Sequence, residues 1–361
     1  MVKKIKLFDP VIDTSEKKAI LQILKSGFWA SGAGVGNVLK FENKFKKYIK
    51  SDECVAVNSG TAALNLALSL FDIKNKEVIL PSLSFVSTAH CIIENKGIPV
   101  FVDVEPETLC IDPKKIISAV TKKTRIILPV HFGGMPCNLN EIQKIAKKYN
   151  LDIVEDAAHS AGSMYHNNKI GTHGQAVCFS FHPVKNLGMP TGGLISINSS
   201  KYKKFKKLLM ERRWCGITNR KGSNYDVKEM GWNYYMNEFS AAIGIEQLKK
   251  LDNSNSIRKR IGKKFNEKIN VEIKMPYNED CSYHLYWILV KNREKFREKL
   301  SENGIETGTH YKPIHLMSMY KKNQRLPITE KVGKQIVTLP IHPNLSKKDI
   351  DKIIRLVNKF I

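Results

Sequence analysis

Short, continuous apolar runs alternate with amphipathic stretches through the first half of the chain. A strand buried on both faces has such a continuous run, whereas a helix that covers a sheet has apolar positions three or four residues apart. The alternation therefore predicts an α/β fold, a parallel sheet with helices on both faces. The expected strands are residues 55–57, 77–80, 99–102, 125–130 and 151–154, and the expected helices among them are 86–95, 113–120 and 139–149.

Two amphipathic helices are expected before the sheet, at residues 13–26 and 38–50. The segment between them, residues 29–36, is rich in glycine. It follows a helix rather than a strand, so it is not the phosphate-binding fingerprint of a dinucleotide fold.

The pattern changes after residue 170. Two apolar runs, residues 176–181 and 193–197, predict a pair of strands that bracket Lys185. Helices are expected at residues 201–213 and 237–251, the second beginning at an Asn-Glu start signal.

The last third of the chain has a different pattern again. A strand at residues 284–290 and helices at 294–303 and 347–360 indicate a smaller α+β unit. Because the length also favours two domains, we expect a large α/β domain in residues 1–251 and a small α+β domain in residues 252–361.

The composition is ordinary for a folded soluble protein: 361 residues, of which 42% are hydrophobic and 26% charged. No stretch approaches the roughly 20 apolar residues of a membrane span, and the basic N-terminus lacks the apolar core of a signal peptide. Seven cysteines are scattered without a C-x-x-C pair. These features predict a cytoplasmic protein with no membrane partner and no metal site.

The formal net charge of +25 has two interpretations. One is attraction to nucleic acid or to anionic small molecules. The other is that lysines coat solvated helix faces, which is favoured because they are spread along the chain rather than gathered in one tail. No helix-turn-helix, zinc pattern or aromatic–basic stacking motif accompanies them, so a nucleic-acid-binding regulator is a distant alternative and no nucleic-acid partner is expected.

Lys185 has the most informative local sequence. Apolar, aromatic and small residues precede it, including Phe179, Phe181 and Pro183, and no acid is adjacent. Such surroundings let an ammonium group lose its charge and become a nucleophilic amine. A lone lysine is more often a surface residue, so the segment alone does not establish a site.

Three other segments add to the lysine. Residues 58–64 form a small-residue turn that leads into a helix, either an anion site or an ordinary N-cap. Asp156 lies at the carboxyl end of an expected parallel strand, where open α/β sheets place their ligands, although it could also cap a turn. Residues 231–239 run into a helix start and could be packing alone.

Together these segments supply what pyridoxal phosphate requires. The cofactor needs a lysine for its Schiff base and a carboxylate that keeps the pyridine nitrogen protonated, so that the ring acts as an electron sink. It also needs an anion cradle for its phosphate and a flat partner for its ring. The joint pattern predicts this cofactor more strongly than any one segment does.

At this point the chain resembles the DegT/DnrJ/EryC1/StrS family of sugar aminotransferases. The family has the fold of aspartate aminotransferase, that is, fold type I of the pyridoxal-phosphate enzymes. The likeness extends over nearly the whole chain. The motifs that carry it best are residues 57–64, 155–159 and 179–186, with further matches at 310–313 and 339–340.

The resemblance implies a role for each matching residue. Lys185 matches the Schiff-base lysine, which also moves the proton between substrate and cofactor, and Asp156 matches the carboxylate at the pyridine nitrogen. His159 falls beside the ring and its phenolic oxygen. Gly60, Thr61 and Ser180 match the phosphate ligands. Phe85 matches the aromatic residue that stacks on the ring, and Asn233 lies where a second subunit reaches the site.

The resemblance also implies a homodimer with active sites at the subunit interface. The expected activity is transfer of an amino group, with glutamate as donor, to a nucleotide-linked keto-sugar in polysaccharide, glycan or amino-sugar biosynthesis. Trp29, His310 and Tyr311 are candidates for binding the sugar nucleotide, with ordinary packing as the alternative.

Two positions depart from the family pattern. Thr191 precedes Gly192-Gly193 where an acid is frequent, and Tyr235 follows Asn233-Tyr234 where Arg, Lys or Asn is frequent. Some relatives are sugar dehydratases that carry His in place of the lysine. Lys185 favours transamination here, and a dehydratase or another pyridoxal-phosphate enzyme remains the alternative.

Overall fold

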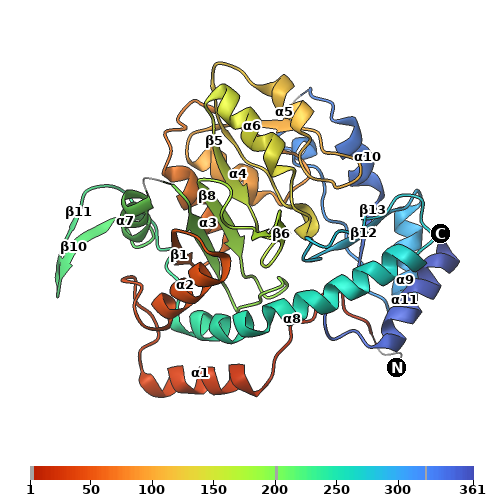
Figure 1. Ribbon diagram of the computed structural model, residues 1–361, viewed down its shortest axis with the longest axis horizontal. Coiled ribbons are helices and arrows are strands. Elements are labelled where there is room, and N and C mark those ends of the chain that lie inside the picture. The colour runs from red at the N-terminus through yellow and green to blue at the C-terminus, as the bar shows by residue number, and fades with distance from the viewer. Residues whose placement is uncertain (1–3, 200–201, 322) are drawn as a thin grey trace.

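The computed structural model describes residues 4–199, 202–321 and 323–361. A central sheet forms the middle of the molecule, a long helix, α8 (Glu238–Lys268), runs along one side of it, and the marks for both chain ends lie on the same side of the view, near α9 (Arg293–Glu302) and α11 (Lys347–Phe360) (Figure 1). A two-stranded hairpin projects from the opposite end. The arrangement matches the expected fold class, and a central sheet, parallel except for one strand, carries the site.

The central sheet has the strand order β1-β9-β8-β5-β4-β2-β3. Every neighbouring pair is parallel except those that β9 makes with β1 and β8. The strands are β1 Glu53–Val57, β2 Glu77–Pro81, β3 Ile98–Val102, β4 Thr124–Ile127, β5 Asp152–Asp156, β8 Ala176–Ser180 and β9 Gly193–Ile197. The expected pair of strands that brackets Lys185 is therefore confirmed as β8 and β9.

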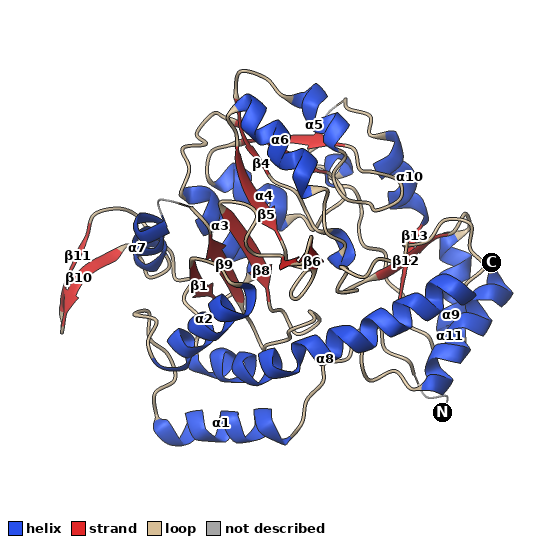
Figure 2. Ribbon diagram, viewed as in Figure 1, coloured by secondary structure: helices blue, strands red, loops and turns tan. Residues whose placement is uncertain are grey.

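Alternate residues of the central strands enter two different apolar cores. In β1, Cys54 and Ala56 belong to one cluster, whereas Val55 and Val57 belong to the other. Side chains of a strand alternate between the two faces of a sheet. Both faces are therefore buried, as the continuous apolar runs predicted, and Figure 2 shows helices on either side of the strands.

Helices begin where short polar side chains can accept from the backbone. Asp13, Ser59, Asn138, Asn237 and Ser346 each accept a hydrogen bond from a backbone N–H group in the first turn that follows. The helices are α1 Thr14–Ser26, α2 Gly36–Ile49, α3 Gly60–Ser69, α4 Ser87–Glu94, α5 Pro113–Ala119, α6 Leu139–Tyr149, α7 Tyr202–Arg212, α8 Glu238–Lys268, α9 Arg293–Glu302, α10 Pro327–Gln335 and α11 Lys347–Phe360.

The expected end of the helix at residue 251 is wrong, because α8 continues to Lys268. Residues 252–256 are Asp, Asn and Ser, which favour turns when only local sequence is considered. Here Ser254 and Asn255 are buried, and the buried face continues to Phe265. Tertiary burial outweighs the weak local preference. The expected division between residues 251 and 252 falls inside this helix, and the two-domain description remains a prediction.

Several short elements were not predicted from the sequence. They are β6 Met164–Tyr165, β7 Asn168–Lys169, β10 Ile217–Lys221, β11 Asn224–Val227, α10 and β13 Ile336–Leu339. The strand β13 pairs with β12, Tyr286–Leu289. β12 is the strand expected at residues 284–290, and its partner comes from a later part of the chain. Among the helices of the described residues, none combines the length and the apolar character that crossing a membrane requires.

Candidate active site

A cavity of about 370 Å³ lies at the carboxyl ends of β5 and β8. Asp156 is the last residue of β5 and Ser180 is the last residue of β8, so the cavity is at the sheet edge where α/β folds bind ligands. Its lining brings together predicted residues that are far apart in sequence: Gly60, Thr61, Phe85, Asp156, His159, Ser180, Lys185, His310 and Tyr311.

Lys185 lies in the loop between β8 and β9, with a half-buried side chain. Burial lowers the pKa of its amine to about 8, and the nearby Asp156 carboxylate opposes that change. A large share of the amine is therefore uncharged at mildly alkaline pH, as a nucleophile requires. Its Nζ lies 3.4 Å from Nε2 of His284.

Asp156 is only 4% exposed. Thr88 Oγ1 donates a hydrogen bond of 2.8 Å to Oδ2, and the backbone N–H of Ala158 donates one of 3.1 Å to Oδ1. Burial raises the pKa of this carboxyl, while both hydrogen bonds and the charge of Lys185 work in the opposite direction. A buried carboxylate held by two neutral donors favours a cationic partner in the cavity.

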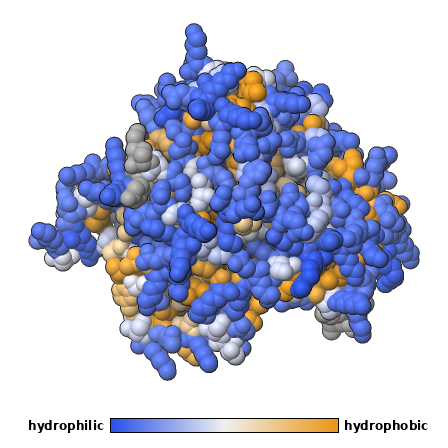
Figure 3. Space-filling view, in the orientation of Figure 1, coloured by the Kyte–Doolittle hydropathy of each residue, from blue (hydrophilic) through white to orange (hydrophobic). Residues whose placement is uncertain are grey.

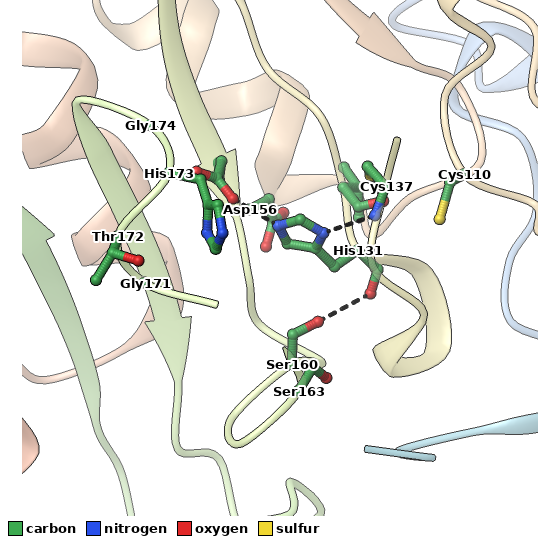
Figure 4. Close-up of polar contacts among 12 residues, drawn as sticks. Cys110, His131, Cys137, Asp156, Ser160, Ser163, Gly171, Thr172, His173 and Gly174 are labelled. Atoms are coloured by element: carbon green, nitrogen blue, oxygen red, sulfur yellow. Dashed lines mark hydrogen bonds and ion pairs between the residues drawn. The ribbon is translucent and has the colours of Figure 1, made fainter. Parts of the chain in front are cut away.

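A second polar layer lies behind Asp156 (Figure 4). His131 Nε2 is 2.8 Å from Oε2 of the fully buried Glu155, and the backbone N–H of Cys137 donates to His131 Nδ1 at 3.1 Å. The backbone of β5 is also fixed here, because His131 N–H donates to Asp156 O and Asp156 N–H donates to Pro129 O. The strand end that carries Asp156 therefore has little freedom to move.

The start of α3 lies in the cavity wall, where the sequence predicts an anion cradle. Ser59 caps the helix by accepting from Ala62 N at 3.1 Å, and the first N–H groups of a helix have no acceptor inside it. Gly60 packs so closely on β8 that an added Cβ would lie 2.7 Å from Cβ of Ser180. Only glycine therefore lets the helix start and the Ser180 hydroxyl share one wall of the cavity.

His159 and Tyr311 form a linked pair. The backbone N–H of Gly133 donates to His159 Nδ1 at 3.2 Å, and His159 Nε2 lies 3.1 Å from the hydroxyl of Tyr311. Burial, and the charge of Lys185 after it, lower the pKa of His159 well below its usual range, so the ring is neutral. Because Nδ1 accepts, we infer that Nε2 carries the proton and donates to Tyr311.

Phe85 presents an aromatic ring to the cavity and is 56% exposed. Its ring centroid lies 6.0 Å from that of Tyr311, and His310 lies beside Tyr311 at 4.9 Å in an edge arrangement. An exposed aromatic face at a cavity is suited to stacking on a flat ring.

Two predicted residues are not brought into the cavity of this chain. Asn233 is exposed, and its backbone oxygen accepts from the Asn58 side chain at 3.2 Å. Trp29 is 52% exposed and packs against Phe239. Their expected roles remain predictions.

The two departures from the family pattern both lie next to the cradle. Thr191 lines the cavity, and its hydroxyl donates to the backbone carbonyl of Asn58. Tyr235 forms a backbone bridge with Val57, the residue before Asn58. Both positions therefore support the turn that carries Gly60.

Sequence reasoning did not single out His284. It was placed only at the start of an expected strand, and a histidine there carries no motif. Its contact with Lys185 joins residues 99 apart in the chain, so only the fold could reveal it.

These residues fit pyridoxal phosphate on structural grounds alone. The buried Asp156 carboxylate would hold the ring nitrogen, and the start of α3 with Ser180 would hold the phosphate. Phe85 would cover one ring face, and Lys185 would bind the carbonyl carbon. Within residues 4–199, 202–321 and 323–361 no group of His, Cys, Asp and Glu side chains is placed to hold a metal ion.

Known proteins resemble the chain over nearly its full length. The model of the DegT/DnrJ/EryC1/StrS aminotransferase family matches residues 10–358. The spore coat polysaccharide biosynthesis protein SpsC of Bacillus subtilis is 32% identical, covering 98% of this chain and 96% of SpsC. GDP-perosamine synthase of Escherichia coli O157:H7 is also 32% identical, covering 99% of each chain.

Solved structures agree with these relatives. Spr1654 of Streptococcus pneumoniae, which is assigned as a sugar aminotransferase, matches with a TM-score of 0.92 and 25% identity in its PMP-form, covering 99% of this chain and 97% of that one. Its PLP-form matches with a TM-score of 0.91, covering 99% and 100%. The family model and the fold agree, and the chain belongs to the pyridoxal-phosphate-dependent DegT/DnrJ/EryC1/StrS family of sugar aminotransferases.

Proposed function

We propose that this protein transfers an amino group from glutamate to a nucleotide-linked keto-sugar. The observation that carries the proposal is the arrangement of Lys185 and Asp156 in one cavity, with the start of α3 as an anion cradle in its wall. When bound, pyridoxal phosphate supplies an electron sink for the bond changes at the substrate carbon. The side chains of this chain supply orientation and proton transfer.

Lys185 is proposed as the catalytic residue. It would hold the cofactor covalently until the donor amine displaces it, and its free amine would then take the α-proton from the donor and deliver it to the cofactor. A general base works best when its pKa is near the working pH, and the Lys185 amine has a pKa of about 8. Since one cavity serves donor and acceptor in turn, ping-pong kinetics are expected.

The other cavity residues are proposed to hold the cofactor. Asp156 keeps the ring nitrogen protonated, and Thr88 and Ala158 fix its two oxygens. Gly60, Thr61 and Ser180 bind the phosphate. Phe85 covers one face of the cofactor ring, and His159 lies beside the phenolic oxygen of the ring.

A nucleotide-linked sugar is proposed as the amino acceptor. The name of the relative GDP-perosamine synthase supports a nucleotide sugar, and the name of SpsC supports a role in polysaccharide biosynthesis. His310 and Tyr311 line the cavity and are proposed to contact the sugar. The positive net charge suits an acceptor that carries a diphosphate. A cytoplasmic location is part of the same proposal, because nucleotide sugars and glutamate are available there.

A homodimer with shared active sites is also proposed. Hydrophobic residues gather at the lower left of the surface, in the region of α1 and α2 (Figure 3). Exposed apolar side chains on α1, α2 and the loop between them are Leu21, Leu24, Phe28, Trp29, Val35 and Leu39. Patches of this kind mark interaction surfaces. If a second copy covers this patch, Trp29 becomes buried, and the exposed Asn233 can meet the partner's cofactor.

Two measurements test the cofactor assignment. Purified protein should absorb as a pyridoxal-phosphate enzyme, and borohydride reduction followed by peptide mapping should find the cofactor on Lys185. The exposed Lys144 serves as the internal control, because it should carry no label. A Lys185→Arg variant keeps the positive charge and should be neither labelled nor active. Label on another residue contradicts the proposal.

The substrate assignment needs a separate assay. A panel of nucleotide-linked keto-sugars should each be supplied with glutamate, and 2-oxoglutarate and the amino-sugar should be measured together. Equal amounts of both products support transamination. Loss of a sugar hydroxyl without amine transfer would instead favour the dehydratase alternative. Light scattering on the eluting protein tests the dimer, and a monomer with full activity would contradict the shared site.

A further inference from the structure

His284 is a buried histidine whose ring makes a single polar contact among the residues that the structure describes. Its ring is 2% exposed. Its Nε2 lies 3.4 Å from Nζ of Lys185, and its Nδ1 has no hydrogen-bond partner in the part of the chain that the structure describes. Burying a polar ring carries a free-energy cost that hydrogen bonds usually offset. Packing alone would be better satisfied by an apolar residue, so the contact with Lys185 needs an explanation.

The backbone on both sides of His284 is anchored. Ser282 N–H donates to Gly134 O at 3.3 Å and Leu285 N–H donates to Gly133 O at 3.1 Å. The same turn donates from Gly133 N–H to His159 Nδ1. His284 and His159 are therefore positioned by one turn, and their ring centroids lie 4.5 Å apart.

The ring itself is also held. Phe8 stacks on it with a centroid distance of 5.6 Å and an interplanar angle of 18°. With the backbone anchored and one face covered, the Nε2 atom has a fixed direction toward the lysine. Such preorganisation is what a group needs to hold a mobile amine in one place.

The charge state of His284 limits what it can do. Burial is the main cause that lowers its pKa well below the usual range, and the charge of Lys185 adds to it. A neutral ring has one N–H group and one lone pair. Since both the charged and the neutral amine of Lys185 can donate, an accepting Nε2 satisfies the lysine in either state.

We propose that His284 is a positioning residue for the free Lys185 amine, accepting a hydrogen bond from Nζ whenever the lysine is released from the cofactor. The proposal rests on the proposed function, because that reaction releases the lysine when the donor amine arrives. The released amine would otherwise swing on a four-carbon chain. Held at His284, it stays beside the reacting carbon and is ready to move the proton.

Other titratable groups lie around Lys185 in the cavity and enter any interpretation of its pH dependence. They are Asp156 on β5, His159 in the turn after β5, His182 on the same loop as Lys185, and His310 with Tyr311 in the C-terminal part. Asp156 favours the ammonium form, whereas burial favours the neutral amine. Removing the His284 acceptor takes away one contact that stabilises the Lys185 ammonium, while the other groups stay in place. The ammonium of Lys185 should therefore lose its proton at a lower pH.

Two variants separate this role from packing. In His284→Gln the amide reaches the position of Nε2, whereas in His284→Asn the shorter amide cannot. Both are polar and similar in size, so a purely structural effect should appear in both. The readout is the ionisation of Lys185 in cofactor-free protein. Reductive methylation is followed over a range of pH, and the Lys185 peptide is measured by mass spectrometry.

The pH midpoint for methylation of Lys185 should lie near 8 in the protein without substitutions. It should fall by about half a pH unit or more in His284→Asn and be restored to near 8 in His284→Gln. In the cofactor-loaded protein, the single-turnover half-reaction with glutamate should slow by about tenfold in His284→Asn, the factor that one hydrogen bond to a charged group provides, and be largely restored in His284→Gln. The proposal is overturned if the protein without substitutions and His284→Asn have the same methylation midpoint. It is also overturned if His284→Asn and His284→Gln lose equal amounts of the half-reaction rate. If the unmodified protein does not react with glutamate, the proposed function fails, yet the methylation result still decides the role of His284.

Discussion

The hydroxyl of Thr191 donates a hydrogen bond to the backbone carbonyl of Asn58. This contact ties the loop that carries Lys185 to the turn that precedes α3, where the phosphate is proposed to bind. Asn58 is held from another side as well, because its N–H donates to Tyr234 O at 2.7 Å. The turn before Gly60 thus connects the lysine loop with the segment in which Asn233 lies.

Removal of the Thr191 hydroxyl should weaken binding of the cofactor phosphate. We expect Thr191→Val to raise the Kd of pyridoxal phosphate about five- to tenfold, because one ordinary hydrogen bond positions the cradle. Thr191→Ser keeps the hydroxyl and should bind normally. Pyridoxal without its phosphate is the matched ligand, and its Kd should not change. A Val variant with unchanged phosphate-dependent affinity would refute this role.

Association of the cofactor should depend on the ionisation of Lys185. The neutral amine attacks the cofactor carbonyl, and burial lowers its pKa to about 8. The association rate of cofactor-free protein should therefore rise with pH through about 8 and level off above it. Stopped-flow absorbance between pH 6.5 and 9.5 measures this rate. A rate that is flat across that range would show that the amine is already neutral or that another step limits binding.

The contact between Thr88 and Asp156 should affect turnover more than cofactor retention. Thr88→Val removes a donor from the Asp156 carboxylate, so its pKa should rise further and its hold on the ring nitrogen should weaken. We expect kcat to fall about fivefold, with Thr88→Ser close to normal. Asp156→Asn removes the charge and should cost about 100-fold or more. The absorbance of bound cofactor checks that each variant is loaded.

Breaking a buried ion pair away from the cavity should destabilise the fold strongly. Arg213 and Glu42 are 0% and 3% exposed, and Nη1 lies 2.6 Å from Oε1. Replacing one partner leaves a buried charge unpaired, which costs about 3–5 kcal/mol. Arg213→Met should therefore lower the free energy of urea unfolding by about that amount. The double variant with Glu42→Met should recover much of it, and additive losses would contradict the coupling.

Buried histidines near the lysine should make the protein sensitive to mild acid. Burial lowers the pKa of His310 to about 4, and it lowers the pKa values of His159 and His284 as well. Below about 6.5 the unfolded chain binds protons at these sites while the folded chain does not. Stability is thus fully present above about pH 6.5 and declines as pH falls toward the folded pKa values. Urea midpoints at pH 7.5, 6 and 5 should decrease in that order, and equal midpoints would refute this.

The sequence predicted the sheet because its strands are buried on both faces and therefore apolar throughout. The pair β8 and β9 was predicted for the same reason. The predicted end of α8 at residue 251 is too early because the Asp, Asn and Ser residues after Leu251 resemble a turn locally. In the fold, Ser254 and Asn255 are buried and the helix continues. The strand β13 was missed because its stability comes from pairing with β12, which local pattern does not reveal.

Residue types and spacing determined the cofactor chemistry: an apolar lysine segment, a carboxylate at a strand end and a small-residue turn at a helix start. Each has a local signature, so the sequence alone led to Lys185, Asp156 and Gly60. The fold decided which side chains meet them. His284 reaches Lys185, Thr88 reaches Asp156 and Thr191 reaches Asn58, and each contact depends on chain packing across tens of residues or more rather than on any local pattern.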